Sequence, residues 1–214
     1  MLRHHARVFW TLILLFMIAP AHGAWAGAPT DQLRDGVDRV FKVLRDPELA
    51  GDSHATQRRS AILTAAGSIF DFGEMAKRAL GPHWTTRTPA ERTQFVALFT
   101  DLMQHSYISK VDQHGSAKMV YRTETIEGDH AAVRTTIPLG NGSEMPLEYR
   151  MHHADARWQV YDLSIDGISL VGNYRAQFNK VIRLESYDAL VAKLKLHQAE
   201  FSVPAPSGGA TSTR

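Results

Sequence analysis

The chain has 214 residues, with 24 lysines and arginines, 22 aspartates and glutamates, and no cysteine. That length suits one domain whose core needs neither disulfides nor metal to hold it. The absence of cysteine excludes a disulfide framework, a thiol nucleophile and cysteine-ligated metals. The near balance of charge argues against a nucleic-acid-binding protein, which needs a basic excess to replace the counterions of the phosphates.

The first 26 residues are typical of a cleaved export signal. Arg3 and Arg7 give a basic start, and residues 8–19 form an uncharged, mostly apolar run. That run is shorter than the roughly 20 residues that a membrane-spanning helix needs. An Ala-Trp-Ala triplet at 24–26 places small residues at the positions that a signal peptidase reads. We therefore predict a signal peptide over 1–26 and a mature protein in the periplasm, with equal numbers of basic and acidic residues.

Apolar residues recur at three- and four-residue steps between 31 and 114, which predicts helices. A first helix is expected from Asp31 to just before Pro47, and a second over about 55–70. Asp71 is placed to cap a short third helix that ends at the Gly-Pro pair after Leu80.

The sharpest local motif is Thr88-Pro89-Ala90-Glu91, a capping box with proline at the first helical position. In such a box the threonine hydroxyl and the glutamate carboxylate each accept a backbone N–H at the helix start. The helix that it opens is expected to run to about Gln113, which makes it the longest element of the chain.

From 117 to 166 the apolar pattern changes to a period of two, which predicts strands over about 118–127, 131–137, 145–152 and 157–165. Short turns separate them, so we expect a four-stranded antiparallel sheet with one face solvated. The helical part at 30–115 precedes the sheet, and helices over 169–198 follow it, which predicts an α+β fold. Residues 203–214 are rich in Pro, Gly, Ser and Thr, and we expect a disordered tail there.

No catalytic or metal-binding motif stands out. His152 and His153 are adjacent on a predicted strand, so their side chains point to opposite faces and do not readily share a metal ion. Glu148, Asp162 and Asp166 could act as a general base, but each lies on the charged face or at a strand end, where exposed carboxylates are common. We therefore predict a protein that is not an enzyme and that needs no metal or cofactor.

Flexible and aromatic apolar side chains gather on the third and fourth predicted strands. Met145, Tyr149, Met151 and Trp158 are expected to face the long helix through its apolar residues Phe95, Phe99, Leu102 and Met103. Such side chains fill a core, and methionine also suits surfaces that meet variable apolar ligands. Periodicity alone leaves a filled core and a ligand cavity both open.

Two sets of motifs resemble those of the MlaC family, also called the toluene-tolerance family. In the first half these are Phe-Asp-Phe at 70–72, Met-Ala at 75–76, Trp84 and the capping box at 88–91. In the second half they are WQVYDL at 158–163, IDGISLV at 165–171 and NYRAQF at 173–178. The similarity runs from about Leu33 to Leu194 with the motifs in the family's order.

That resemblance implies a single lipid-binding domain over 27–202, with a curved sheet of the nuclear-transport-factor type and an apolar cavity between sheet and helices. It also implies a periplasmic phospholipid carrier that maintains outer-membrane lipid asymmetry, with phospholipid as cargo rather than cofactor. Its expected partners are an outer-membrane lipoprotein complex and an inner-membrane ABC transporter complex with an MCE-domain ring. A small-molecule enzyme of the same fold and a protein-binding periplasmic adaptor are the alternatives.

The resemblance and the apolar pattern together suggest which residues would contact the lipid tails. They are Phe72, Phe95, Phe99, Leu102, Val133, Ile137, Met145, Leu147, Tyr149, Met151 and Tyr174. For Arg175 two roles remain open: contact with a membrane-complex partner, or, together with the polar residues beside it, hydrogen bonds that tie the last helix to the sheet.

Overall fold

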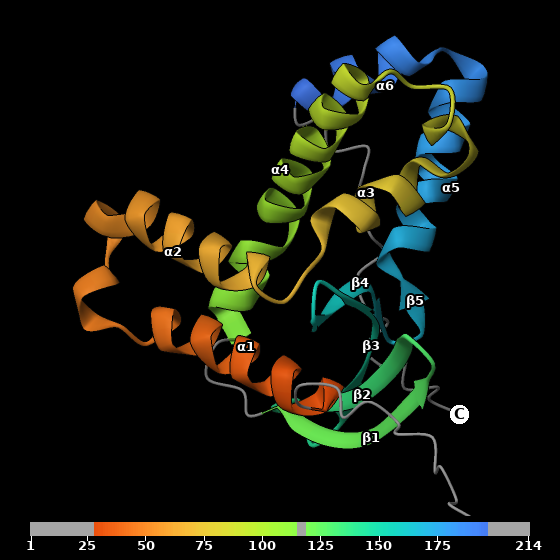
Figure 1. Cartoon of the computed structure of the whole chain (residues 1–214). Coiled ribbons are helices and arrows are strands. Elements are labelled where there is room, and N and C mark those ends of the chain that lie inside the picture. The colour runs from red at the N-terminus through yellow and green to blue at the C-terminus, as the bar shows by residue number, and fades with distance from the viewer. Residues whose placement is uncertain (1–27, 115–118, 197–214) are drawn as a thin grey trace, which may run out of the picture.

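The computed structural model describes residues 28–114 and 119–196, and the predicted signal peptide and C-terminal tail lie outside them. Within these residues α-helices come first, then a sheet, then two further α-helices, in the order that the sequence predicts (Figure 1). The helices before the sheet are α1 (Pro29–Leu44), α2 (Ala55–Gly67), α3 (Phe72–Leu80) and α4 (Pro89–His114).

Side-chain caps fix the starts of α3 and α4 as predicted. Asp71 Oδ1 accepts the backbone N–H of Glu74 at 2.9 Å. At the start of α4, Thr88 Oγ1 accepts the N–H of Glu91 at 3.2 Å, and the Glu91 carboxylate accepts the N–H of Thr88 at 2.7 Å. Each bond satisfies an N–H that the helix itself leaves without an acceptor, so the capping box is confirmed.

A curved antiparallel sheet follows, with its strands side by side in chain order (Figure 1). The strands are β1 (Val120–Glu127), β2 (His130–Pro138), β3 (Glu144–Ala154), β4 (Arg157–Ile165) and β5 (Ile168–Ser169). The sequence predicts four of them. The fifth has only two residues, too few for a period-two pattern to reveal, and it returns through a turn in which Asp166 and Gly167 have φ of 51° and 78°.

A bulge interrupts the pairing of β3 with β4. Arg150 lies opposite Asp162 and Met151 opposite Val160, so Tyr161 is an extra residue on β4. Such a bulge bends its strand and increases the local twist. Strand β4 therefore bends next to Val160, the residue that pairs with Phe70 in the segment before α3.

Two helices complete the described chain: α5 (Leu170–Leu184) and α6 (Tyr187–Lys195). The predicted cap of α5 is confirmed, because Ser169 Oγ accepts the N–H of Gly172 at 2.8 Å. Ser186 caps α6 in the same way through the N–H of Ala189. Since α5 begins directly after β5, it leads from the sheet to the other helices (Figure 1).

The buried apolar side chains divide into two cores. The helical core, from α3 to α6, contains Met75, Ala76, Ala79, Leu80, Phe95, Phe99, Leu102, Met103, Val171, Tyr174, Phe178, Tyr187, Leu190, Val191 and Leu194. The sheet core, between α1 and the inner face of the sheet, contains Leu33, Ile69, Ala131, Val133, Leu147, Tyr149, Met151, Trp158 and Val160. We refer to the surrounding elements as the helical lobe and the sheet lobe.

This division corrects one expectation. The sequence suggests that Met145, Tyr149 and Met151 face Phe95 and Phe99 of the long helix. The structure instead places these two sets in different cores. The physical reason is that Leu33 and the rest of α1 cover the sheet, while Phe95 and Phe99 pack against α5.

The two lobes are joined by a short stretch of backbone at the bulge. The N–H of Val160 donates to the carbonyl of Ile69 at 2.8 Å, and the N–H of Asp71 donates to the carbonyl of Val160 at 2.9 Å. In addition, His152 Nε2 lies 3.1 Å from Asp71 Oδ2. The second predicted helix therefore ends at Gly67 rather than near 70, because residues 69–71 pair with β4.

Candidate functional site

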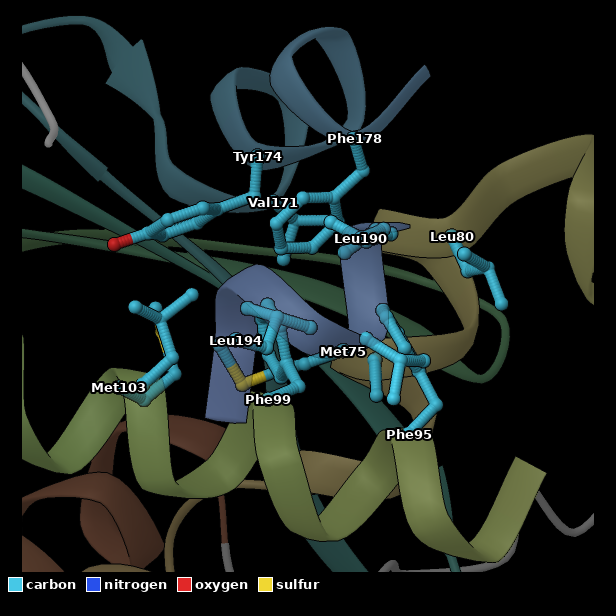
Figure 2. Packing of buried hydrophobic residues seen from close by; sticks show 14 of the residues in the cluster. Met75, Leu80, Phe95, Phe99, Met103, Val171, Tyr174, Phe178, Leu190 and Leu194 are labelled. Atoms are coloured by element: carbon cyan, nitrogen blue, oxygen red, sulfur yellow. The ribbon is translucent and has the colours of Figure 1, made fainter. Parts of the chain in front are cut away.

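The predicted tail-contacting residues of the helical lobe form its buried core or pack against it, and Phe95, Phe99 and Tyr174 are seen there in Figure 2. Phe95, Phe99, Tyr174 and Phe178 have no exposed surface. The Phe95–Phe178 and Phe99–Tyr174 ring centroids are 5.7 and 5.8 Å apart, and both pairs meet edge to face. This is the favoured geometry for aromatic packing, so each ring already has its partners. Leu102 belongs to the same core, and the partly buried Phe72 packs against it.

The predicted residues of the sheet lobe share one face of the sheet. Val133, Leu147, Tyr149 and Met151 are buried in the sheet core. Ile137 and Met145 lie opposite each other at the hairpin end of β2 and β3, and both keep part of their surface exposed. Because side chains two residues apart point to the same face, this side of β3 is apolar from Met145 to Met151.

Around Ile137 and Met145 the apolar face is only partly covered. Besides Phe70 and Leu163, five further side chains pack against the sheet core while remaining partly exposed: Val37, Val40, Met119, Tyr121 and Ile165. We call these five residues, together with Ile137 and Met145, the apolar rim. Sequence reasoning missed these five, although Val37 and Val40 follow the helical spacing of α1 and Tyr121 lies on a predicted strand.

Two phenols stand at the inner edge of the rim. The Tyr149 hydroxyl points toward the sulfur of Met119 at 3.9 Å, and full burial raises its pKa well above the usual value. Burial also raises the pKa of Tyr121 to about 12, with a further contribution from the Asp38 carboxylate. Both phenols are therefore neutral at physiological pH, which suits contact with an apolar ligand.

Two of the three carboxylates considered as general bases, Asp162 and Glu148, make other contacts in the structure. Asp162 is buried, and its two oxygens accept the Ser169 hydroxyl at 2.6 Å and the Val171 N–H at 3.1 Å. Glu148 binds two arginines: partial burial alone would raise its pKa, but hydrogen bonds from Arg150 and Arg134 lower it overall. Within residues 28–114 and 119–196, no group of His, Asp and Glu is arranged to hold a metal ion.

Arg175 lies exposed on α5, beside the end of α3. Its Nε donates to the carbonyl of Arg78 at 3.0 Å, and its stem passes Gly81, where φ is 58°. This bond gives Arg175 a structural role, but it ties α5 to α3 rather than to the sheet. Contact with a partner stays a prediction.

Within the described part of the chain, no helix combines the length and the hydropathy that a membrane span requires.

The architecture places the chain among α+β proteins in which a curved antiparallel sheet joins a lobe of helices. It is similar to a solved phospholipid-binding protein from Ralstonia solanacearum, determined in complex with a phospholipid. The TM-score is 0.69 at 24% identity, and the match covers 82% of this chain and 99% of that one.

The amino-acid sequence assigns the chain to a protein family. The model of the MlaC protein family matches residues 34–196, and the chain belongs to this family. A curated relative is the intermembrane phospholipid transport system binding protein MlaC of Haemophilus influenzae, 22% identical over 123 residues. That match covers 55% of this chain and 58% of the relative's length.

Proposed function

We propose that the protein binds phospholipid through its acyl chains and carries it across the periplasm between an outer-membrane lipoprotein complex and an inner-membrane MCE-domain ABC transporter. The observation that carries the proposal is the apolar rim, an incompletely covered apolar surface continuous with the sheet core. Family membership and the phospholipid bound to the structural neighbour point the same way.

The proposal places the tails on the sheet lobe. Ile137 and Met145 would meet them first, and Val133, Leu147, Tyr149 and Met151 form the buried continuation of the same face. Phe72, Phe95, Phe99, Leu102 and Tyr174 are omitted, because they form or pack against a helical core whose rings are already in contact with one another.

The energetics require a largely covered lipid. Each buried methylene is worth about 0.8 kcal/mol, so two chains of about sixteen carbons represent on the order of 20 kcal/mol of gross transfer free energy. That value is near the practical ceiling of about 18–21 kcal/mol for non-covalent binding. Release into water would be very slow, so transfer must occur within a complex that offers an equally apolar path.

Native mass spectrometry of protein purified from cells tests the proposal directly. We expect a co-purifying mass of phospholipid size on the wild-type protein. In the variant Met145→Trp the indole would occupy rim space otherwise held by methylenes, each worth about 0.8 kcal/mol, and we expect roughly half or less of the lipid to remain.

The matched control is Thr125→Trp, which adds the same ring to an exposed position on the other face of the sheet, opposite Ala132. It should retain normal lipid. Wild-type protein that is empty or bound only to another protein contradicts the carrier function. Equal lipid loss in both variants contradicts the assignment of the rim.

A further inference from the structure

A polar hollow of about 300 Å³ lies on the face of the sheet opposite the apolar one. Arg150 and Asp162, paired across β3 and β4, form its floor, and the bulge residue Tyr161 lies beside them. Arg78 from α3 and Arg175 from α5 complete the wall. The hollow thus forms where both lobes meet, and three arginines from three elements surround it.

The three guanidinium groups are held in place through their Nε atoms. Arg78 Nε donates to Glu74 at 2.8 Å, and its Cζ lies 4.0 Å from the centroid of the Tyr161 ring. Arg150 Nε donates to Glu148, and Arg175 Nε to the carbonyl of Arg78. Their terminal nitrogens donate to no acceptor within residues 28–114 and 119–196. The donors best suited to an external oxyanion are therefore still available.

Positive charge is in excess around the hollow. Glu74 is shared between two cations and so is Glu148, while Asp162 already accepts bonds from the start of α5. The five cations of this cluster are Lys77, Arg78, Arg134, Arg150 and Arg175. Against these three carboxylates they leave an excess of two positive charges.

We propose that this hollow binds a phosphate group, supplied either as free phosphate or as the headgroup of a lipid at a membrane surface. Guanidinium groups offer paired N–H donors that match two phosphate oxygens, and such charge-assisted bonds are stronger than neutral ones. A volume of about 300 Å³ is at the lower end for small-molecule sites, which suits a group of this size. Because the sheet separates the hollow from the apolar rim, this site is distinct from the proposed tail site.

Amide NMR of the full mature protein can detect the binding locally. Val171 and Gly172 line the hollow, so their backbone amide signals serve as reporters. Potassium phosphate would be titrated against potassium chloride at constant ionic strength. We expect saturable shifts of these two signals with phosphate and none with chloride.

Variants separate this site from general electrostatics. Arg150→Gln should weaken phosphate binding by about tenfold, the effect of losing one charge-assisted hydrogen bond. Arg150→Lys keeps the charge but not the paired donors, so it should fall between Arg150→Gln and the wild type. The matched control Arg122→Gln removes an exposed arginine that pairs with Glu144 elsewhere on the sheet, and it should bind as the wild type does.

A second measurement identifies the source of the phosphate. Sedimentation with phosphatidylglycerol vesicles that depends on Arg150 supports a lipid headgroup. Saturable phosphate binding without vesicle binding supports free phosphate.

Two results would overturn the proposal: no saturable phosphate shift together with no vesicle binding that depends on Arg150, or equal weakening in Arg122→Gln and Arg150→Gln. Thermal unfolding of each variant distinguishes loss of the site from loss of the fold.

Discussion

The two lobes use apolar residues differently. In the helical lobe Phe95, Phe99, Tyr174 and Phe178 are fully buried and pack against one another, several pairs edge to face. In the sheet lobe the buried face continues into a rim of partly exposed residues around Ile137 and Met145. A filled core stabilises one arrangement of the chain, whereas an incompletely covered face leaves contacts that a ligand can supply.

The largest expected effect tests whether the helical lobe is filled. Phe99→Ala should lower the free energy of unfolding by about 3–5 kcal/mol, because the neighbouring rings cannot collapse into the space left behind. Chemical denaturation of delipidated protein measures it. Met145→Ala, in the partly exposed rim, should cost well under half as much. Equal losses would mean that the rim is packed as tightly as the helical core.

A second, smaller effect concerns the cover of the sheet lobe. Gly36 lets α1 approach the sheet core, because a Cβ there would overlap Cγ1 of the buried Ile69. Gly36→Ala should cost about 1–3 kcal/mol through this overpacking. Gly67→Ala is the control, since an added Cβ at Gly67 meets no atom within 4 Å. A Gly36→Ala protein as stable as the control would show that α1 can move away from the sheet without cost.

The smallest effect is a pH dependence in the helical lobe. The backbone N–H of Thr88 and then its hydroxyl lower the pKa of Glu91 from its usual 4.5. A carboxyl with a lowered pKa in the folded state contributes stability above its unfolded value, and that contribution disappears as the pH falls through the folded value. The difference in Tm between the wild type and Glu91→Gln should therefore be present at neutral pH and shrink in acid. A difference that does not change with pH would show that the charge of Glu91 has no part in capping.

Features that depend on neighbouring residues could be predicted from the sequence. The caps at Asp71, Thr88 and Ser169 are local hydrogen bonds, and the four longer strands follow a period that local alternation reveals. The pairing of residues 69–71 with Val160 could not be predicted, because it joins segments far apart in the chain and leaves no periodic signal.

In the candidate site, too, contacts between distant segments could not be predicted from the sequence. Alternation correctly places Met145, Leu147, Tyr149 and Met151 on one face, but it does not say which helix covers that face. The cover is α1 rather than the long helix, a choice made by long-range packing. The hollow between Arg78, Arg150 and Arg175 brings together three distant segments, so no pattern within a single segment predicts it.

The route of the chain through the two lobes has a consequence for the order in which they form. The sheet is a meander in which each strand pairs with the next, so its contacts close short loops and can form early. The helical core joins segments on both sides of the sheet in sequence: the Tyr187 hydroxyl donates to the carbonyl of Glu91, 96 residues away. Closing so long a loop has a larger entropic cost. In this protein the strands are therefore expected to assemble before the helical core, which is complete only when the last helix returns to its place.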